Sequence, residues 1–418
     1  MTIKIHSRRR DNIALVALLI FHALCFAAIA TIFRGAIGLD VAEGVIGGPE
    51  WQLSYIRHPP FSTWLTGLAI NFAPYEEFVI YFFGELLVLA SLLMAAWFVA
   101  SQTKKPIAWP ALIAFLVSPF ATYLALKLNH NLGLMPFWIL TIIAAWYALE
   151  RGKIWDWIFV GLAIGLGLWA KYQILLLVFT LILISIYDPK WQRHWTTIGP
   201  WLTFIITAII VTPHLIDISN RNFSTIFFAL RHDEAQFNTI ILRFLEFTTD
   251  VILYNLAFAI SIGFIVGYRH LYKQTLQWLF QLLQSRFDVY LLLAAIGPII
   301  IILIATIFGV RPRIHWLVPS APSFIAVWAR IVTLSKIRLS LTFLIRNYLI
   351  MFSVVLGLYV TNRYADALIN PKPLYAEMDD EALAKIAQEE WAAVSENPIP
   401  YIVSFGGQHG RQVAGSVA

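Results

Sequence analysis

The sequence predicts an all-α polytopic membrane protein, and its composition gives three reasons for this. Of the 418 residues, 59% are hydrophobic and 13% are charged, whereas a soluble domain carries about 25% charged residues. The deficit of charge runs along the whole chain, so a soluble domain with a single anchor is excluded. Aromatic residues make up 15% of the chain. Tryptophans lie where apolar runs end, as in an interfacial belt: Trp51, Trp109, Trp155, Trp195 and Trp316.

About eleven apolar segments are long enough to cross a bilayer core of about 30 Å. They cover 12–33, 77–100, 106–126, 132–149, 154–170, 172–187, 197–216, 250–268, 289–309, 315–334 and 343–361. We therefore expect a transmembrane domain at 1–361, with a first loop at 34–76, followed by a short segment at 362–418.

The distribution of basic residues predicts the orientation. The first apolar run follows Arg8, Arg9 and Arg10 and is too long for a signal-peptide core, so we expect an uncleaved anchor with a cytoplasmic N-terminus. If successive spans alternate in direction, five basic connections fall on the inside: Lys104 and Lys105, Arg151 and Lys153, Lys190 and Arg193, 269–286, and Lys336 and Arg338. The loop at 34–76, the later polar corners and the C-terminus fall on the outside.

Three segments outside the spans have patterns of their own. Residues 273–287 predict an amphipathic helix on the inner membrane surface. Residues 62–72 are too short to span and are expected in the outer interface. The C-terminal segment predicts an acidic helix at 375–394 and a strand at 398–405. Because one strand does not make a stable sheet, this segment is either a docked appendage or a truncated α/β domain.

Several function classes are excluded or disfavoured. The single cysteine, Cys25, excludes a disulfide framework and a cysteine-based metal site. The net charge of +6 is explained by basic cytoplasmic loops, and no basic face predicts nucleic-acid binding. No Walker, Rossmann or nucleophile-elbow motif indicates a nucleotide donor or an acyl-enzyme mechanism.

The first loop, GLDVAEGVIGGPEWQLSYIRHPPFSTW at 38–64, concentrates ionisable residues beside a membrane segment. Such residues are costly there and usually functional. Asp40 and Glu43 share one face of a helical turn, and one of them could act as a general base. The pair also fits a helix-capping box, and the two interpretations are compatible. Arg57 and His58 are held by the following Pro59-Pro60 and suit a phosphate group, the alternative being interfacial snorkelling of Arg57.

Other outside corners add cations and amides. Lys127, Asn129, His130 and Asn131 form one corner, and Lys171-Tyr172 form another, where a lysine between two spans needs a partner or snorkels to headgroups. Arg311, Arg313 and His315 suit a phosphate or an anionic lipid headgroup. A further outside loop carries His214, Arg221, Arg231, His232, Asp233 and Glu234. A metal site at 232–234 matches no strong spacing, and a solvated face is the favoured interpretation.

The chain resembles bacterial glycosyltransferase family 39 and related GT-C-fold membrane transferases, which include protein O-mannosyltransferases, aminoarabinose transferases and lipid A galacturonosyltransferases. The first loop matches their acidic motif and Pro-Pro order through Asp40, Glu43, Trp51, Tyr55, His58, Pro59, Pro60 and Trp64. Further matching pieces are LNHNLGLMPFW at 128–138, GLAIGLGLWAKYQILL at 161–176 and HWLVPSAP at 315–322. The residue after Asp40 is Val41, where many relatives have Glu.

The resemblance implies an inverting transfer from a polyprenyl-phosphate sugar to a lipid A, core, other glycan or protein acceptor on the periplasmic side of a bacterial inner membrane. Asp40 would be the general base, with Glu43 as second acid, and a divalent cation, if one is bound, would use both. Donor-phosphate contacts are expected from Arg57, His58, Lys127, Lys171, Arg311, Arg313 and His315. Substrate positioning is expected from Tyr55, Asn129, Asn131 and Tyr172. The alternatives are a lipid or solute transporter, or an inactive truncated paralogue.

Overall fold

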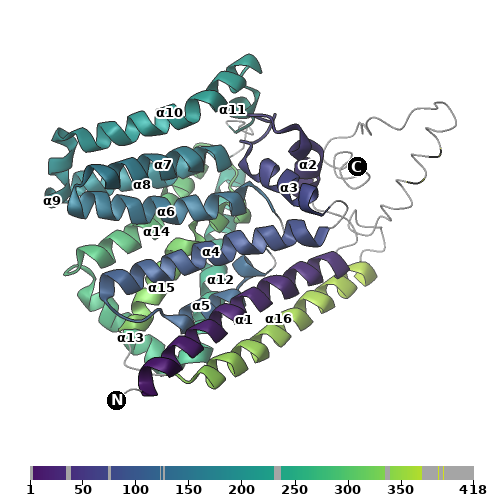
Figure 1. The fold of residues 1–418 in the computed structure, drawn as a ribbon, viewed down its shortest axis with the longest axis vertical. Coiled ribbons are helices and arrows are strands. Elements are labelled where there is room, and N and C mark those ends of the chain that lie inside the picture. The colour runs from purple at the N-terminus through teal and green to yellow at the C-terminus, as the bar shows by residue number, and fades with distance from the viewer. Residues whose placement is uncertain are drawn as a thin grey trace.

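The predicted all-α class is confirmed by the computed structural model (Figure 1). It describes residues 3–33, 39–73, 77–122, 124–125, 128–229, 237–334, 339–369, 385 and 389. The predicted helix and strand of the C-terminal segment therefore lie outside the described residues, apart from Lys385 and Glu389.

Long helices pack side by side and share one core. α1 (Ile3–Phe33) lies beside α4 (Glu77–Thr103) and α16 (Leu341–Ile369), and a second layer contains α6 (His130–Arg151), α7 (Ile154–Ala170) and α10 (Ile198–Asn220). The remaining long elements are α8 (Ile174–Tyr187), α12 (Phe237–Val266), α14 (Arg286–Ile307) and α15 (Ala321–Thr333).

Eight helical segments of the described residues are long and apolar enough to cross a membrane. A ninth candidate is α8 with α9 (Pro189–Gln192) and η3 (Arg193–Thr196), which is bent by 100°. The predicted span at 106–126 is wrong, because it contains only the eight residues of α5 (Trp109–Leu116) and the short η2 (Pro119–Ala121). Ser118 precedes Pro119 and is extended, as a residue before proline prefers, so the helix cannot continue.

The predicted long outside loop at 217–249 is also largely wrong. α10 continues to Asn220, α11 covers Ser224–Ala229 and α12 begins at Phe237. The charges that made 217–221 look like a loop are accommodated on helix α10 and just after its end, where Asp217 and Arg221 form an ion pair at 3.1 Å.

The first loop is mostly helical. α2 (Leu39–Gly47), η1 (Gly48–Glu50) and α3 (Phe61–Phe72) fold back on one another, and α3 covers the segment 62–72 that is too short to span a membrane. Gly48 and Gly67 make this packing possible, because a Cβ on Gly48 would lie 2.6 Å from the Gly67 backbone. α3 is joined to α6 by Ser62 Oγ, which donates to the Asn129 carbonyl at 3.1 Å.

An amphipathic helix was expected at 273–287; α13 (Tyr268–Leu282) begins and ends five residues earlier, and 286–287 belong to α14. α13 buries Leu271, Gln274 and Trp278, while Phe280 is exposed. Leu283, just after its end, is exposed as well. An exposed apolar stripe on an otherwise polar helix is typical of a helix lying on a membrane surface.

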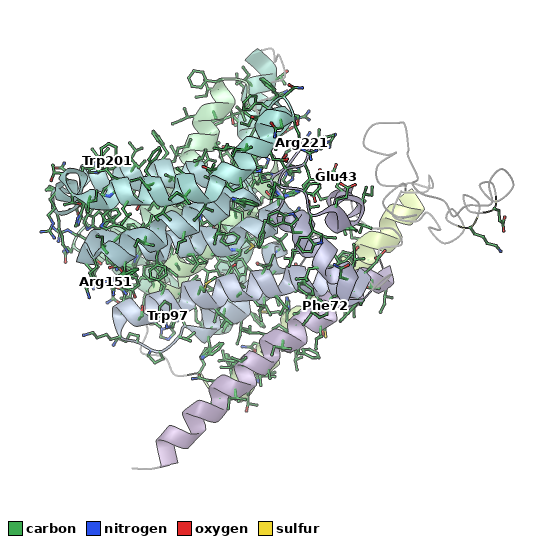
Figure 2. The ribbon with its side chains drawn as sticks, turned by 45° about the horizontal axis from the view of Figure 1, so that its top comes forward. Glu43, Phe72, Trp97, Arg151, Trp201 and Arg221 are labelled. Atoms are coloured by element: carbon green, nitrogen blue, oxygen red, sulfur yellow. The ribbon has the colours of Figure 1, made fainter. Side chains whose placement is uncertain are left out.

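The polar connections gather at two opposite ends of the molecule (Figure 2), where Glu43, Phe72 and Arg221 lie at one end and Trp97, Arg151 and Trp201 at the other. We call the first the Asp40 end; it comprises 39–73, 128–131, 171–173, 217–229 and 309–316. The second, the Arg151 end, carries basic residues that the sequence predicts to be cytoplasmic, among them Arg151, Lys190 and Arg286.

Candidate active site

Asp40 lies in the first turn of α2 and is partly buried. Because the helix already begins at Leu39, Asp40 is not the residue before the helix that a capping box requires. Its Oδ2 accepts a hydrogen bond from Asn129 Nδ2 at 3.0 Å. The acid is therefore held by a neutral amide.

Asn129 is the N-cap of α6, and this role orients its side chain. Its Oδ1 accepts from the backbone N–H groups of Asn131 at 3.0 Å and of Leu132 at 3.2 Å. With the oxygen committed to the helix end, the Nδ2 group has to point the other way, toward Asp40. A helix cap thus fixes the direction of a hydrogen bond to the candidate base.

Lys171 occupies the tight corner between α7 and α8. Its Nζ donates to Asn131 Oδ1 at 2.5 Å and lies 5.8 Å from the centre of the Trp316 ring. Burial lowers the pKa of Lys171 to about 8, and the nearby Asp40 carboxylate opposes the shift. The lysine therefore has no bonded carboxylate among the described residues and is held by an amide two residues after the one that holds Asp40.

His58 and His130 stack against each other in the same site, with ring centroids 4.1 Å apart. Burial, His130 and Lys171 lower the pKa of His58, while Asp40 raises it, so His58 is neutral at neutral pH. His130 is almost fully buried, and its Nδ1 has no hydrogen-bond partner within the described part of the chain. The sequence places His130 in an outside corner but gives it no role; the structure places it against a predicted site residue.

Glu43 and Arg57 pair with each other, with Arg57 NH1 3.5 Å from Glu43 Oε1. The two residues predicted as second acid and phosphate ligand thus contact each other beside the site. Within the described residues, no three His, Cys, Asp or Glu side chains come close enough together to hold a metal ion.

Tyr55 holds the first loop together. Its hydroxyl donates to the Gly47 carbonyl at 2.7 Å and accepts from the Gln52 backbone N–H at 3.2 Å. Burial raises its pKa. The Tyr55 hydroxyl thus makes two hydrogen bonds within the first loop.

Tyr172 links the α7–α8 corner to α10. Its hydroxyl lies 2.8 Å from His214 Nε2, and His214 Nδ1 lies 2.6 Å from the Leu53 carbonyl oxygen in the first loop. Burial raises the pKa of Tyr172. The sequence places His214 in a polar loop, but the structure makes it the bridge between the first loop and the corner that carries Lys171.

The second half of the first loop is fastened to the end of α10 and to α11. Ser54 Oγ donates to Asp217 Oδ2 at 2.5 Å, and Thr225 Oγ1 donates to the Tyr55 carbonyl at 2.5 Å. Sequence analysis missed Asp217 and Thr225, because a hydroxyl or carboxylate that fixes a distant loop has no local pattern.

Arg311, Arg313 and His315 are exposed around the start of η4 (Ile314–Ser320). η4 itself is close to the site, since Gln173 Nε2 donates to the Trp316 carbonyl at 2.6 Å. Lys127 and the cluster Arg231, His232, Asp233 and Glu234 lie outside the described residues.

Comparison with known proteins relates this chain to membrane glycosyltransferases. Residues 57–216 match the family model of dolichyl-phosphate-mannose-protein mannosyltransferases. The lipopolysaccharide core galacturonosyltransferase RgtA of Rhizobium johnstonii is 22% identical over 183 residues, a match that spans 43% of this chain and 37% of that relative. This chain therefore matches well under half the length of its curated relative.

The solved structures of ArnT from Cupriavidus metallidurans have a similar fold. The structure bound to undecaprenyl phosphate has a TM-score of 0.60 at 16% identity and covers 96% of this chain and 75% of its own. The apo structure has a TM-score of 0.59 at 15% identity and covers 97% and 75%, respectively. By fold, the chain is a polytopic membrane protein of the GT-C class. The resemblance to glycosyltransferase family 39 and its relatives, stated from the sequence, is confirmed, and the comparisons support a glycosyltransferase.

Proposed function

We propose that this chain transfers a sugar from a polyprenyl-phosphate donor to an envelope acceptor at the extracytoplasmic face of the bacterial inner membrane. The acceptor class comprises lipid A, core or other glycans, and protein. The fold and the family match support the transferase class, and the bound lipid of the ArnT structure supports the donor class. The basic residues of the Arg151 end support the orientation, with the Asp40 end outside.

One observation carries the proposal: the first turn of α6 presents two amides that hold opposite charges. Asn129 holds Asp40 at 3.0 Å and Asn131 holds Lys171 at 2.5 Å. A sugar transfer from a phosphate needs both, because a base must take a proton from the acceptor while a cation stabilises the leaving phosphate. Neutral amides fix both groups without cancelling their charges.

The reaction we propose is a single displacement with inversion. Asp40 Oδ2 is bonded to Asn129, which leaves Oδ1 to accept the proton of the acceptor hydroxyl or amine. The acceptor atom attacks the anomeric carbon, the bond from that carbon to the phosphate oxygen breaks, and the phosphate keeps the electron pair. Lys171 is the cation for that phosphate, and His58 donates a hydrogen bond to it as a neutral imidazole. This sequence of steps uses only these side chains.

The Asp40→Asn variant tests the base. Removing a general base lowers a rate by about 10²–10⁴-fold, so cells with this variant should lack the product although the protein is made at normal levels. Mass spectrometry of lipid A and envelope glycans would compare a deletion strain complemented with wild type, Asp40→Asn or Glu43→Gln. We expect wild type and Glu43→Gln to restore the same sugar. Full restoration by Asp40→Asn would refute Asp40 as the base, and an unchanged deletion strain would refute the envelope acceptor.

A further inference from the structure

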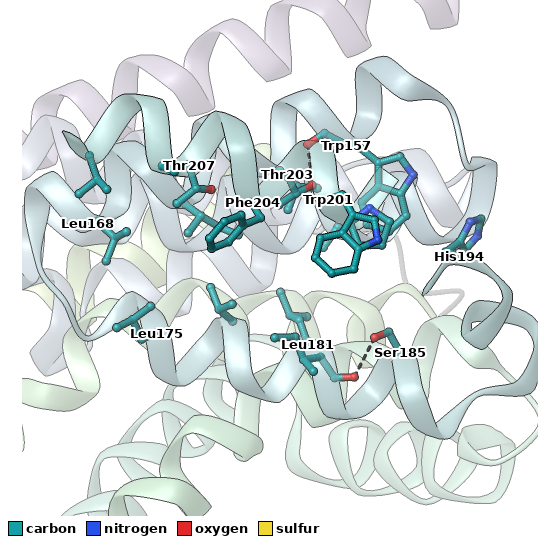
Figure 3. Close-up of a pocket in the computed structure, with 18 of the residues that line it drawn as sticks. Trp157, Leu168, Leu175, Leu181, Ser185, His194, Trp201, Thr203, Phe204 and Thr207 are labelled. Atoms are coloured by element: carbon teal, nitrogen blue, oxygen red, sulfur yellow. Dashed lines mark hydrogen bonds between the residues drawn. The ribbon is translucent and has the colours of Figure 1, made fainter. Parts of the chain in front are cut away.

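Two cavities formed by the described residues differ in character. One, of about 610 Å³, lies between α8 and α10 against α7 (Figure 3); Leu168, Trp201 and Phe204 are among its lining residues, and none of the described residues that line it is Asp, Glu, Lys or Arg. The other, of about 440 Å³, lies at the Arg151 end between α4, α6, α14 and α15. We call it the Lys105 pocket. Its polar lining residues are Gln102, Thr103, Lys105, Ser285, Arg330 and Thr333.

Three of these polar side chains are already bonded inside the protein. Gln102 Nε2 donates to the Tyr147 hydroxyl at 2.8 Å, and Gln102 Oε1 accepts from Trp146 Nε1 at 2.8 Å. Thr103 and Thr333 each donate to a backbone carbonyl of their own helix at 2.7 Å. The donor groups of these three residues are therefore mostly used within the protein, and a ligand would be recognised by the other three.

The other three polar side chains still have hydrogens to donate. Arg330 bonds both oxygens of Asp288 through Nε and Nη2, at 2.7 and 3.0 Å. The guanidinium is thereby fixed, while its Nη1 has no acceptor among the described residues. Lys105 is exposed and its ammonium group bonds to no described side chain. The Ser285 hydroxyl accepts from the Asp288 N–H at 3.2 Å and keeps its own hydrogen to donate.

The charge of the pocket favours an anion. None of the described residues that line it is Asp or Glu, and the Asp288 carboxylate behind Arg330 is fully buried. Lys105 and Arg330 carry two positive charges and Asp288 one negative charge, so the pocket is positive. A guanidinium, an ammonium group and a hydroxyl that all donate into one space match the oxygens of a phosphate group.

The size and position of the pocket indicate a phosphate ester. A volume of about 440 Å³ lies within the range of about 300–1,000 Å³ that is typical of small-molecule sites. α13, whose exposed Phe280 suits a membrane surface, packs against α14 and α15 and ends at Leu282, shortly before Ser285. The pocket therefore lies near the level of a lipid headgroup layer, where basic residues attract anionic lipids.

We infer that the Lys105 pocket binds a phosphate ester on the cytoplasmic side, with Lys105, Arg330 and Ser285 donating to the phosphate oxygens. The bound ester joins the end of α4 to α14 and α15. This site goes beyond the proposed function and shares with it only the orientation, which places the Arg151 end inside. The phosphate belongs either to an anionic phospholipid headgroup or to a soluble ester, and the choice of probes separates these two sources.

A matched pair of lysine variants tests the site in the full-length purified protein. Lys105→Gln removes the free cation of the pocket, whereas Lys104→Gln removes a neighbouring exposed lysine that does not line it. Because both lysines are exposed, neither change should affect folding. Binding would be measured by native mass spectrometry with phosphatidylglycerol, phosphatidylcholine and glycerol phosphate as separate probes.

Wild type and Lys104→Gln should bind phosphatidylglycerol more tightly than phosphatidylcholine, whose headgroup has no net charge. Removing one basic residue beside an anionic headgroup costs a factor of about five in affinity, so Lys105→Gln should weaken phosphatidylglycerol binding about fivefold. A loss of the same kind for glycerol phosphate would identify a soluble ester as the ligand. If the two lysine variants bound every probe equally, or if wild type bound neither phosphatidylglycerol nor glycerol phosphate, the inference would be overturned.

A filled pocket gives a second test. Thr333→Phe places a ring among the lining residues and should weaken binding at least as much as Lys105→Gln, which keeps the test open if Thr333→Phe does not fold. Because a ligand that binds only the folded protein raises its unfolding temperature, the bound ester should raise the midpoint less in the pocket variants than in wild type and Lys104→Gln. An equal rise in all of them would contradict the site. Neither measurement involves sugar transfer, and Asp40→Asn should bind the probes like wild type.

Discussion

The two ends of the molecule treat buried charge in opposite ways. At the Arg151 end, three carboxylates bond directly to cations: Asp288 to Arg330 at 2.7 Å, Glu150 to Lys190 at 2.6 Å and Asp188 to Arg286 at 3.0 Å. At the Asp40 end, ion pairs occur at the flanks, as in Glu43–Arg57. In the centre, Asp40 and Lys171 bond instead to the amides of Asn129 and Asn131.

This difference distinguishes structural charges from functional ones. A carboxylate that is already paired with a guanidinium has little remaining capacity to take a proton or bind a ligand. An amide fixes the position of a charged group but leaves its charge available. The pairs at the Arg151 end therefore stabilise the helix bundle, whereas in the proposed reaction Asp40 and Lys171 supply the anion and the cation that act on the substrate.

The largest effect should come from breaking the buried pair at the Arg151 end. Asp288 is fully buried and bonds Arg330 through both of its oxygens, at 2.7 and 3.0 Å. Asp288→Ala would leave a buried, unpaired guanidinium and should lower the free energy of unfolding by about 3–5 kcal/mol. Denaturant unfolding of the detergent-solubilised protein would measure it.

Arg151→Ala is the control for that experiment, since the Arg151–Asp156 pair is at the surface, with 45% of the Arg151 side chain exposed. Exposed pairs contribute about 0–1 kcal/mol. The double variant Asp288→Leu/Arg330→Met should recover most of the loss, because it removes both charges. Equal unfolding midpoints for Asp288→Ala and Arg151→Ala would contradict the proposed division between the two ends.

A smaller effect is expected at Asn129, and it concerns pH dependence. Asn129→Asp keeps an acceptor for the α6 N-terminus but replaces the donor to Asp40 by a second carboxylate. Two ionised carboxylates at hydrogen-bond distance repel each other, so the acid limb of this variant's rate profile should lie at higher pH than that of the wild type. Initial rates of sugar transfer between pH 4 and 8, each about one unit apart, would show the shift.

Asn129→Ala separates this electrostatic effect from the loss of the cap. It should cost about 1 kcal/mol of stability and lower the rate, but it adds no charge and should leave the acid limb in place. If both variants shifted the profile equally, Asn129 would not act on Asp40 through its donor group.

The sequence was sufficient for the fold class because hydropathy and charge bias extend over hundreds of residues. The prediction of a span at 106–126 failed because Ser118-Pro119 ends the helix inside an apolar run. The prediction of a loop at 217–249 failed because the charged residues of an i,i+4 ion pair near the end of a helix resemble the charged residues of a loop. Neither feature can be recognised from the composition of the segment.

At the site, the sequence could identify groups but not their partners. Asp40, His58, Lys171 and the amides Asn129 and Asn131 were recognised as polar residues beside apolar segments. Asn129 bonds Asp40 and Asn131 bonds Lys171 because the N-terminus of α6 packs against both α2 and the α7–α8 corner. A local sequence pattern does not predict such packing. For the same reason the sequence does not show that Arg57 lies 3.5 Å from Glu43, while phosphate binding by Arg57 stays a prediction.

The smallest predicted effect concerns Lys171 and alkaline pH. Its pKa is lowered to about 8, so the ammonium form is lost as the pH rises above that value, and undecaprenyl phosphate binding should weaken by up to about tenfold at pH 9.

The free energy of unfolding should change in the opposite direction. Between the folded pKa and the ordinary lysine pKa of 10.5, the unfolded chain binds more protons, so the free energy of unfolding increases as the pH rises. Lys171→Arg keeps its charge at this pH and should abolish both trends. Alkaline weakening of binding that persists in Lys171→Arg would place the donor phosphate on another residue.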